Sequence, residues 1–311
     1  MFTMWKTTFR TIGVGLAAGA LAAYGATARP GTVNYIEGQV TLDGQSVGAQ
    51  AMGSTEVQPG QMLQTGQGKV EMLLTPGVFL RLADQSAVRM VSPSLIDTRV
   101  ELIRGEAMVE ADQVLPGNHL VISDHGTDVQ IQKNGVYKFT ADPATVAVYD
   151  GKAQVFRDDR TTEIGKGKEL TLAAATGQKP GSFDRNSVDS LYQWSDVRSE
   201  YLAEANQSSV QTIVVGYPGG WYGAGWYWNP WFSSWAFVPG NGFFYSPFGF
   251  GFYSPAYWSY FPPAHYFVRP GVVATTARVV APAARASMMA APAMRSSIGG
   301  GMRMGGFGGR R

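Results

Sequence analysis

The chain has 311 residues and no cysteine, so a disulfide framework and metal sites built from thiolate ligands are both excluded. Its net charge of +2 is unevenly distributed, because all 23 acidic residues lie between Glu37 and Glu204. Residues 269–311 carry seven arginines and no acidic residue. This asymmetry predicts a basic tail that contacts an anionic surface.

The first 28 residues have the three parts of a secretory signal. Lys6 and Arg10 precede an apolar run at residues 12–23, and small residues follow at Ala26-Thr27-Ala28. This order predicts a signal peptide at residues 1–28 that is cleaved after Ala28. The apolar run is shorter than the ~20 residues of a membrane-spanning helix. We therefore expect an exported protein of the bacterial periplasm or outer cell envelope, with no transmembrane helix after signal removal.

Residues 29–175 alternate between apolar and polar side chains with the period of two that is typical of half-buried strands. Residues 70–74 (VEMLL) and 78–82 (VFLRL) are two such runs. Thr75-Pro76-Gly77 between them predicts a type II turn, because proline presets its own φ and glycine accepts a positive φ. We predict one all-β domain, either an antiparallel β-sandwich or a twisted β-solenoid-like stack.

Residues 176–211 are predicted to form a linker followed by one amphipathic helix. Apolar and small side chains recur at intervals of three and four residues between Val188 and Ala205. This spacing predicts about 20 helical residues, and Asp184 or Asn186 is suitably placed to be the N-cap.

Residues 212–268 contain no charged side chain and are rich in aromatic residues, glycine and proline. Seven prolines interrupt the segment, which excludes a ~20-residue membrane helix. The rings can stack on sugars or lie at a membrane interface. Alternatively, they can pack on the β domain or cause self-association between copies of the chain. The candidate contact residues are Trp221, Trp226, Trp228, Trp231, Trp235, Tyr257 and Trp258. The last segment, 269–311, has a low-complexity composition that predicts disorder.

Several runs in the β region resemble the FecR-type extracytoplasmic domain. They are residues 57–66 (VQPGQMLQTG), 70–74, 79–82 (FLRL), 86–90 (SAVRM), 100–107 (VELIRGEA) and 146–155 (VAVYDGKAQV), and the resemblance covers about residues 31–172. It implies a FecR-like β domain. In regulatory members of that family, a cytoplasmic region that binds a sigma factor precedes a transmembrane helix, and the periplasmic part senses an outer-membrane transporter.

This chain departs from that regulatory plan. The segment before the apolar run is too short for the cytoplasmic region, and the family's GT-F element is replaced by residues 134–139 (NGVYKF). The layout is more similar to exported FecR-domain proteins with aromatic, glycine-rich C-terminal regions.

No sequence motif predicts catalysis. His119 and His125, with Asp124 and Asp128, have no spacing that defines a metal site, and Ser123 next to Asp124 and His125 does not make a catalytic triad. We expect no enzyme activity, no cofactor, no metal and no nucleic-acid partner. The predicted function is a non-catalytic envelope protein whose β scaffold contacts an envelope protein or polysaccharide. The alternative is a periplasmic signalling partner of the FecR type.

Overall fold

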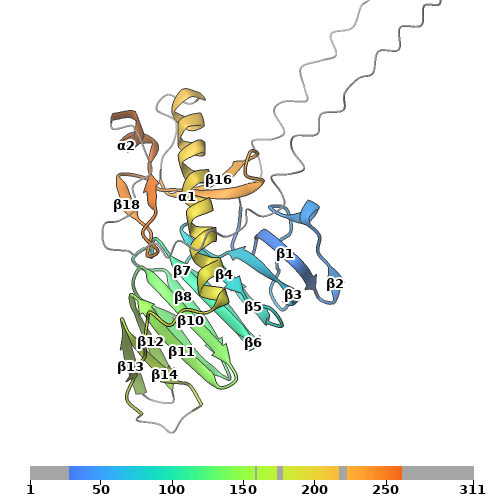
Figure 1. Ribbon diagram of the computed structural model, residues 1–311, viewed down its shortest axis with the longest axis vertical. Coiled ribbons are helices and arrows are strands. Elements are labelled where there is room, and N and C mark those ends of the chain that lie inside the picture. Colours follow the sequence, from blue (N-terminus) through green and yellow to red (C-terminus); the bar gives the residue numbers. More distant parts are fainter. Residues whose placement is uncertain (1–27, 158–159, 174–177, 217–222, 261–311) are drawn as a thin grey trace, which may run out of the picture. The chain divides into compact units, whose positions relative to one another are not determined.

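The computed structural model describes residues 28–157, 160–173, 178–216 and 223–260, all within one compact unit (Figure 1). Most of these residues lie in strands, which confirms the predicted all-β class. The strands are β1 (Val33–Leu42), β2 (Gln45–Ser46), β3 (Met62–Leu73), β4 (Val78–Leu82), β5 (Ala87–Pro93), β6 (Asp97–Arg104), β7 (Glu106–Ala111), β8 (His119–Asp124), β9 (Thr127–Ile131), β10 (Gly135–Ala141), β11 (Ala144–Asp150), β12 (Lys152–Arg157), β13 (Arg160–Gly165), β14 (Lys168–Thr171), β15 (Gly181–Ser182), β16 (Gly225–Asn229), β17 (Ser234–Val238), β18 (Phe243–Tyr245) and β19 (Gly251–Tyr253). The helices are α1 (Ser190–Gly216), α2 (Pro255–Tyr260) and a short 3-10 turn at Ala49–Ala51.

Strands β1 to β15 form one sheet in the order β13-β12-β9-β8-β6-β5-β3-β4-β7-β10-β11-β14-β15, with β1 and β2 attached beside β3. Among the described strands, only β6 and β8 pair in parallel. The two ends of this sheet meet again, because β13 lies beside β14. The sheet therefore folds over on itself, and one core joins apolar side chains from both halves, such as Leu80, Phe139, Ile122 and Val129.

The predicted hairpin at residues 70–82 is confirmed. Val70 pairs with Leu82, and the amide of Val78 donates to the carbonyl of Thr75 at 2.8 Å. Gly77 has a φ of +80°, which is the left-handed conformation that a type II turn requires of its third residue.

The predicted helix is present, although it is longer than expected and has a different N-cap. Asp189 is the cap, because its Oδ1 accepts a hydrogen bond from the amide of Tyr192 at 2.8 Å. Asp184 instead closes a local turn by accepting from the amide of Asn186. The helix continues to Gly216, so its last five residues belong to the uncharged segment 212–268.

The described part of the aromatic segment is folded, because 223–260 form two hairpins, β16–β17 and β18–β19, and then α2. Helix α1 contacts β4 and β7 of the large sheet and also contacts the two hairpins and α2 (Figure 1). Strand β17 also contacts β1 directly, so α1 and the aromatic elements together cover this face of the sheet. No helix in the described ranges has the length and apolar character needed to cross a membrane.

Candidate interaction site

The interface between the large sheet and α1 contains ionised side chains that are completely buried. Glu71 on β3 lies opposite Arg81 on β4, and the arginine Nε donates to Glu71 Oε2 at 2.8 Å. A second carboxylate, Glu110 on β7, approaches Arg81 with an Nη1–Oε2 distance of 2.7 Å. All three side chains are 0% exposed. They project from the face of the sheet that lies against α1, opposite the sandwich core.

Helix α1 completes this cluster with one cation and one hydroxyl group. Arg198 Nη2 donates to Glu71 Oε1 at 2.8 Å, and Ser199 Oγ donates to Glu110 Oε1 at 2.5 Å. Burial by itself would raise the pKa of Glu71, but the two guanidinium groups outweigh it and lower the pKa to about 2. Two carboxylates and two guanidiniums balance in charge, which is the condition for keeping such groups out of water.

Two of the candidate tryptophans attach the aromatic elements to the sheet. Trp226 is 8% exposed and packs edge-on against Phe79 of β4, with ring centroids 5.3 Å apart. Trp235 is 6% exposed, and its indole Nε1 donates to the carbonyl of Gly53 at 2.8 Å. Asn34 of β1 also holds Trp235, because it accepts from its amide and donates to its carbonyl. These rings are part of the packing between layers.

Two further candidates pack within the aromatic elements themselves. Trp258 is 8% exposed and lies edge-on to Tyr253. Tyr257 stacks on Phe243 with ring centroids 5.6 Å apart. Trp221 lies outside the described residues.

Only Trp228 and Trp231, of the described candidate residues, reach the surface to a large extent. Trp231 is 80% exposed and Trp228 is 36% exposed. Trp228 lies on β16, edge-on to Trp235, whereas Trp231 lies in the turn that joins β16 to β17. The structure therefore separates the candidate residues into structural rings and a smaller exposed pair.

The side chains of Asn229 and Tyr201 hold the turn that carries Trp231 against α1. Asn229 Nδ2 donates to the carbonyl of Ala205 and to Ser209 Oγ on α1, and Asn229 Oδ1 accepts from the amide of Trp231. Tyr201 of α1 donates its hydroxyl proton to the carbonyl of Phe232 at 3.2 Å. The backbone beneath the exposed indole is thus positioned before any ligand arrives.

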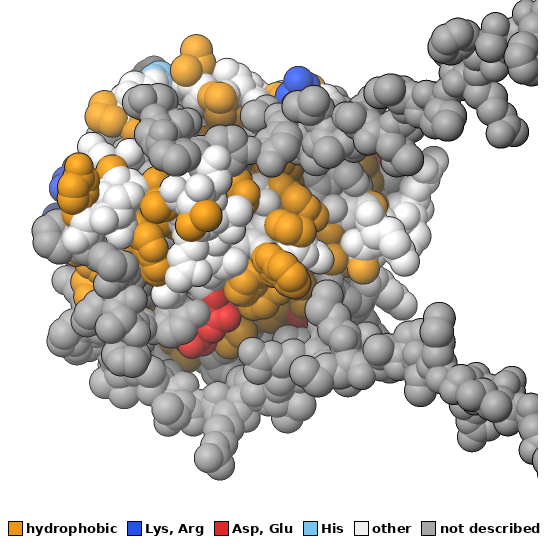
Figure 2. All heavy atoms as spheres, turned by 90° about the horizontal axis from the view of Figure 1, so that it is seen from above, with side chains coloured by type: hydrophobic (Ala, Val, Ile, Leu, Met, Phe, Trp, Pro, Cys, Tyr) orange, Lys and Arg blue, Asp and Glu red, His pale blue; other side chains and the backbone are white. Residues whose placement is uncertain are grey.

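The aromatic elements themselves contain no Asp, Glu, Lys or Arg side chain. Figure 2, which views the molecule from the end where β16, β18 and α2 lie in Figure 1, shows hydrophobic side chains spread over the described surface. Val215 at the end of α1 is 82% exposed and Tyr260 at the end of α2 is 80% exposed. No Asp, Glu, Lys or Arg occurs between Ala205 and Val268 in the sequence. Such a face favours stacking and apolar contact over ionic recognition.

The polar residues considered as a metal site lie on the β8–β9 hairpin. His125 Nδ1 is 2.6 Å from Asp124 Oδ1, and Asp128 pairs with Arg99 and accepts from Ser123. Within the described ranges, no three His, Cys, Asp or Glu side chains are grouped so that they could hold a metal ion.

Comparison with known proteins finds only partial similarity at low sequence identity. No family model matches the chain, and no curated protein matches it. Two crystal structures from Parabacteroides distasonis ATCC 8503, both provisionally described as an anti-sigma factor, are similar to part of it. The first is 15% identical with a TM-score of 0.35, over 40% of this chain and 61% of its own, which is less than two thirds of its length. The second is 14% identical with a TM-score of 0.35, over 50% of this chain and 71% of its own.

Proposed function

We propose that this protein is a non-catalytic component of the bacterial cell envelope that binds a protein or glycan through Trp231 and Trp228. The observation that carries the proposal is an indole that is 80% exposed on a turn fixed to α1 by Asn229 and Tyr201. Fixing the turn in advance lowers the entropy lost on binding. Tryptophan is the side chain most enriched among residues that dominate binding energy, and its flat face also stacks on sugar rings.

The backbone of the turn supports this proposal. Ser233 has a φ of +46°, which places a residue other than glycine in the left-handed region. Such a conformation costs on the order of 1 kcal/mol and persists only where the surroundings impose it. The neighbouring residues are held, because the amide of Trp231 donates to Asn229 and the carbonyl of Phe232 accepts from Tyr201, so the turn presents Trp231 outward.

Export is the second part of the proposal. It is supported by the signal at residues 1–28 and by the fact that β1, the first described strand, begins at Val33, so cleavage after Ala28 removes none of the described strands. Mass spectrometry of the protein purified from its native source should find Arg29 at or within a few residues of the N-terminus. Intact Met1 protein in the cytosol would contradict export.

The binding proposal is tested by cosedimentation of the purified full-length protein with bacterial envelope fractions. Trp231→Ala should weaken binding at least about tenfold, as expected for a dominant contact residue. Ile96→Ala is the matched control, because Ile96 is 70% exposed but lies in the turn between β5 and β6, outside the aromatic elements, and it should change binding less than about twofold. Equal binding by the wild type and Trp231→Ala would reject the proposed surface.

Point variants are preferable to removing the aromatic segment. Deletion of residues 212–311 would expose Phe79 and Leu73, which form an apolar cluster with Trp226 and Phe237. A loss of binding in that variant could then come from unfolding of the remaining chain. Deletion of 269–311 alone should remove mainly a salt-sensitive part of the binding, because that segment carries seven arginines. If Trp231→Ala and this deletion both leave binding unchanged, the β domain makes the contact and the signalling-partner alternative is favoured.

A further inference from the structure

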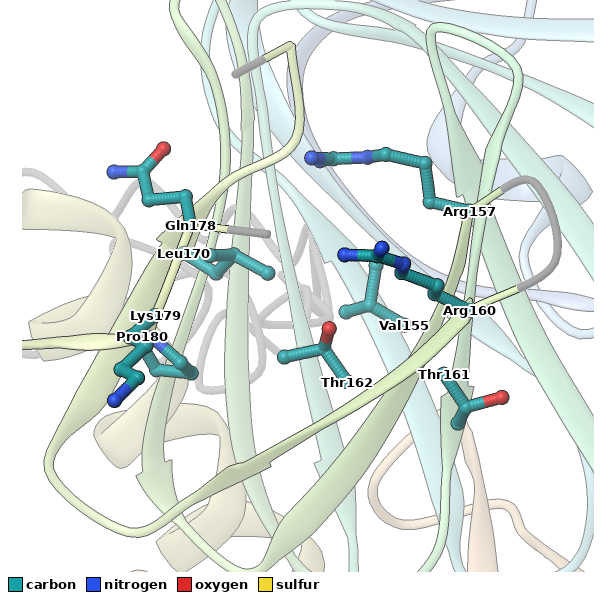
Figure 3. A pocket seen from close by; sticks show the side chains of 9 residues that line it. All are labelled: Val155, Arg157, Arg160, Thr161, Thr162, Leu170, Gln178, Lys179 and Pro180. Carbon is teal, nitrogen blue, oxygen red and sulfur yellow. The ribbon is translucent and has the colours of Figure 1, made fainter. Parts of the chain in front are cut away.

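A second candidate site lies at the open end of the sandwich, where the two ends of the folded sheet meet. A cavity of about 310 Å³ is bounded by the β12–β13 hairpin on one side and by β14 and residues 178–180 on the other (Figure 3). Val155 and Leu170, two buried residues of the sandwich core, form its floor. Among the lining residues that the structure describes, none is acidic, whereas Arg157, Arg160 and Lys179 are basic.

The two arginines are direct neighbours across the hairpin. Arg157 at the end of β12 pairs in register with Arg160 at the start of β13, and Val155 pairs with Thr162. Residues two apart on a strand project from the same face, so these four side chains share the face toward the cavity. In Figure 3 the guanidinium groups of Arg157 and Arg160 point the same way, toward the side of Leu170.

The two arginines differ in how they are held. Arg157 is half-buried, and its Nη2 donates to the carbonyls of Thr171 and Leu172, which ties β12 to the end of β14. Arg160 is exposed and belongs to the edge strand of the sheet. Arg157 therefore forms part of the cavity wall, and Arg160 is the cation that can adjust to a ligand.

We propose that this cavity binds a sugar residue that carries a carboxylate, such as one uronic acid unit of an anionic polysaccharide. Guanidinium groups bind carboxylates through two parallel hydrogen bonds. The hydroxyl of Thr162 and the amide of Gln178 are suited to sugar hydroxyls, and Val155, Leu170 and Pro180 supply apolar surface for the C–H face of the ring. An inorganic anion would gain no favourable contact from the apolar floor. A cavity of about 310 Å³ is at the lower end of the usual range for ligand pockets, which favours a single small unit.

This site is separate from the surface that contains Trp231, so each can fail without the other. The test is calorimetric titration of the full-length protein with D-glucuronate at low ionic strength, with D-glucose and inorganic phosphate as comparison ligands. We expect saturable binding of glucuronate with one site, and much weaker binding of the other two. Equal binding of glucose would overturn the role of the carboxylate, and phosphate that binds as tightly as glucuronate would overturn the role of the sugar.

Single substitutions test whether glucuronate binds in this cavity. Arg160→Ala should weaken glucuronate binding at least about tenfold, and Arg160→Lys should have an intermediate effect, because lysine keeps the charge but loses the two-pronged geometry. Lys133→Gln is the control, since Lys133 is an exposed cation outside the lining and its loss changes net charge equally. Thermal melting should show that every variant is folded. Equal losses of glucuronate binding in Arg160→Ala and Lys133→Gln would overturn the assignment.

Discussion

Arg198 on α1 and Glu71 on β3 form a buried ion pair across 127 positions of the chain, with Nη2 2.8 Å from Oε1. The same guanidinium lies over the ring of Tyr35 on β1, with its central carbon 4.0 Å from the ring centroid. Helix α1 is thus bound to the sheet by an ion pair that is almost completely buried. The aromatic elements pack on α1, so the position of Trp231 depends on this pair.

Loss of Arg198 should destabilise the whole protein. Arg198→Met leaves one carboxylate of the cluster without a balancing cation, and removing one partner of a buried pair costs about 3–5 kcal/mol. Urea unfolding of the full-length protein measures this cost. The double variant Arg198→Met/Glu71→Gln removes one charge of each sign, and it should cost less than the sum of the two single variants. If the cost of the double variant equals the sum of the two single costs, Arg198 and Glu71 are not energetically coupled.

Asp196 on α1 should make the protein less stable as pH rises. Burial, with the nearby carboxylates Glu110 and Glu200, raises its pKa from 3.8 to about 6, although Arg81 acts in the opposite direction. Because the folded state binds this proton more tightly than the unfolded state, the stabilisation is complete below about pH 4 and is lost as pH rises through about 6.

Substitution of Asp196 tests this dependence. Asp196→Asn should increase the free energy of unfolding at pH 7 by on the order of 1 kcal/mol and should flatten its change between pH 4 and pH 6.5. Glu169→Gln on β14, an exposed position, is the control for removing one negative charge and should leave the pH profile unchanged. A parallel profile for Asp196→Asn and the wild type would show that this carboxyl is not responsible.

Gly53 should be required for the packing of Trp228 on the β domain. A Cβ at this position would lie 2.2 Å from Cζ3 of the Trp228 ring, and Gly53 has a φ of +75°. Gly44 has a similar φ of +80° but open space around it, so Gly44→Ala reports the conformational cost alone, about 1–2 kcal/mol. Gly53→Ala should cost more than Gly44→Ala in urea unfolding and should change tryptophan fluorescence. Equal costs and an unchanged spectrum would mean that the ring moves away freely.

The fragment of residues 29–175, which the strand pattern predicts to fold alone, should be β-structured but incompletely covered. Leu73 and Phe79 are 0% exposed in the full chain because the layer containing Trp226 and Phe237 covers them. Without that layer the fragment should bind a hydrophobic dye and melt at a lower temperature than residues 29–260. Circular dichroism melts of the two proteins make the comparison. Equal melting temperatures without dye binding would show that the covering layer adds no stability.

The sequence by itself determined the strands and the turns between them, because both depend on neighbouring residues. Alternation over 70–74 and 78–82 and the φ values of Pro76 and Gly77 are local properties, and the β3–β4 hairpin follows them. The composition of the sequence alone also identified the candidate contact residues. Composition does not show which of them are exposed, because Trp226 and Trp231 are each followed by an aromatic residue but are 8% and 80% exposed.

Only the tertiary structure determined that the polar face of the sheet is buried. Alternation along β3 and β4 predicts that Glu71 and Arg81 lie on the face opposite the sandwich core, and they do. Such a face is ordinarily exposed to water. They are buried because α1, more than 100 residues later, covers them with Arg198 and Ser199. Alternation along a strand determines which way a side chain points. Its burial depends on what packs against that face, and here the covering helix comes from a distant part of the chain.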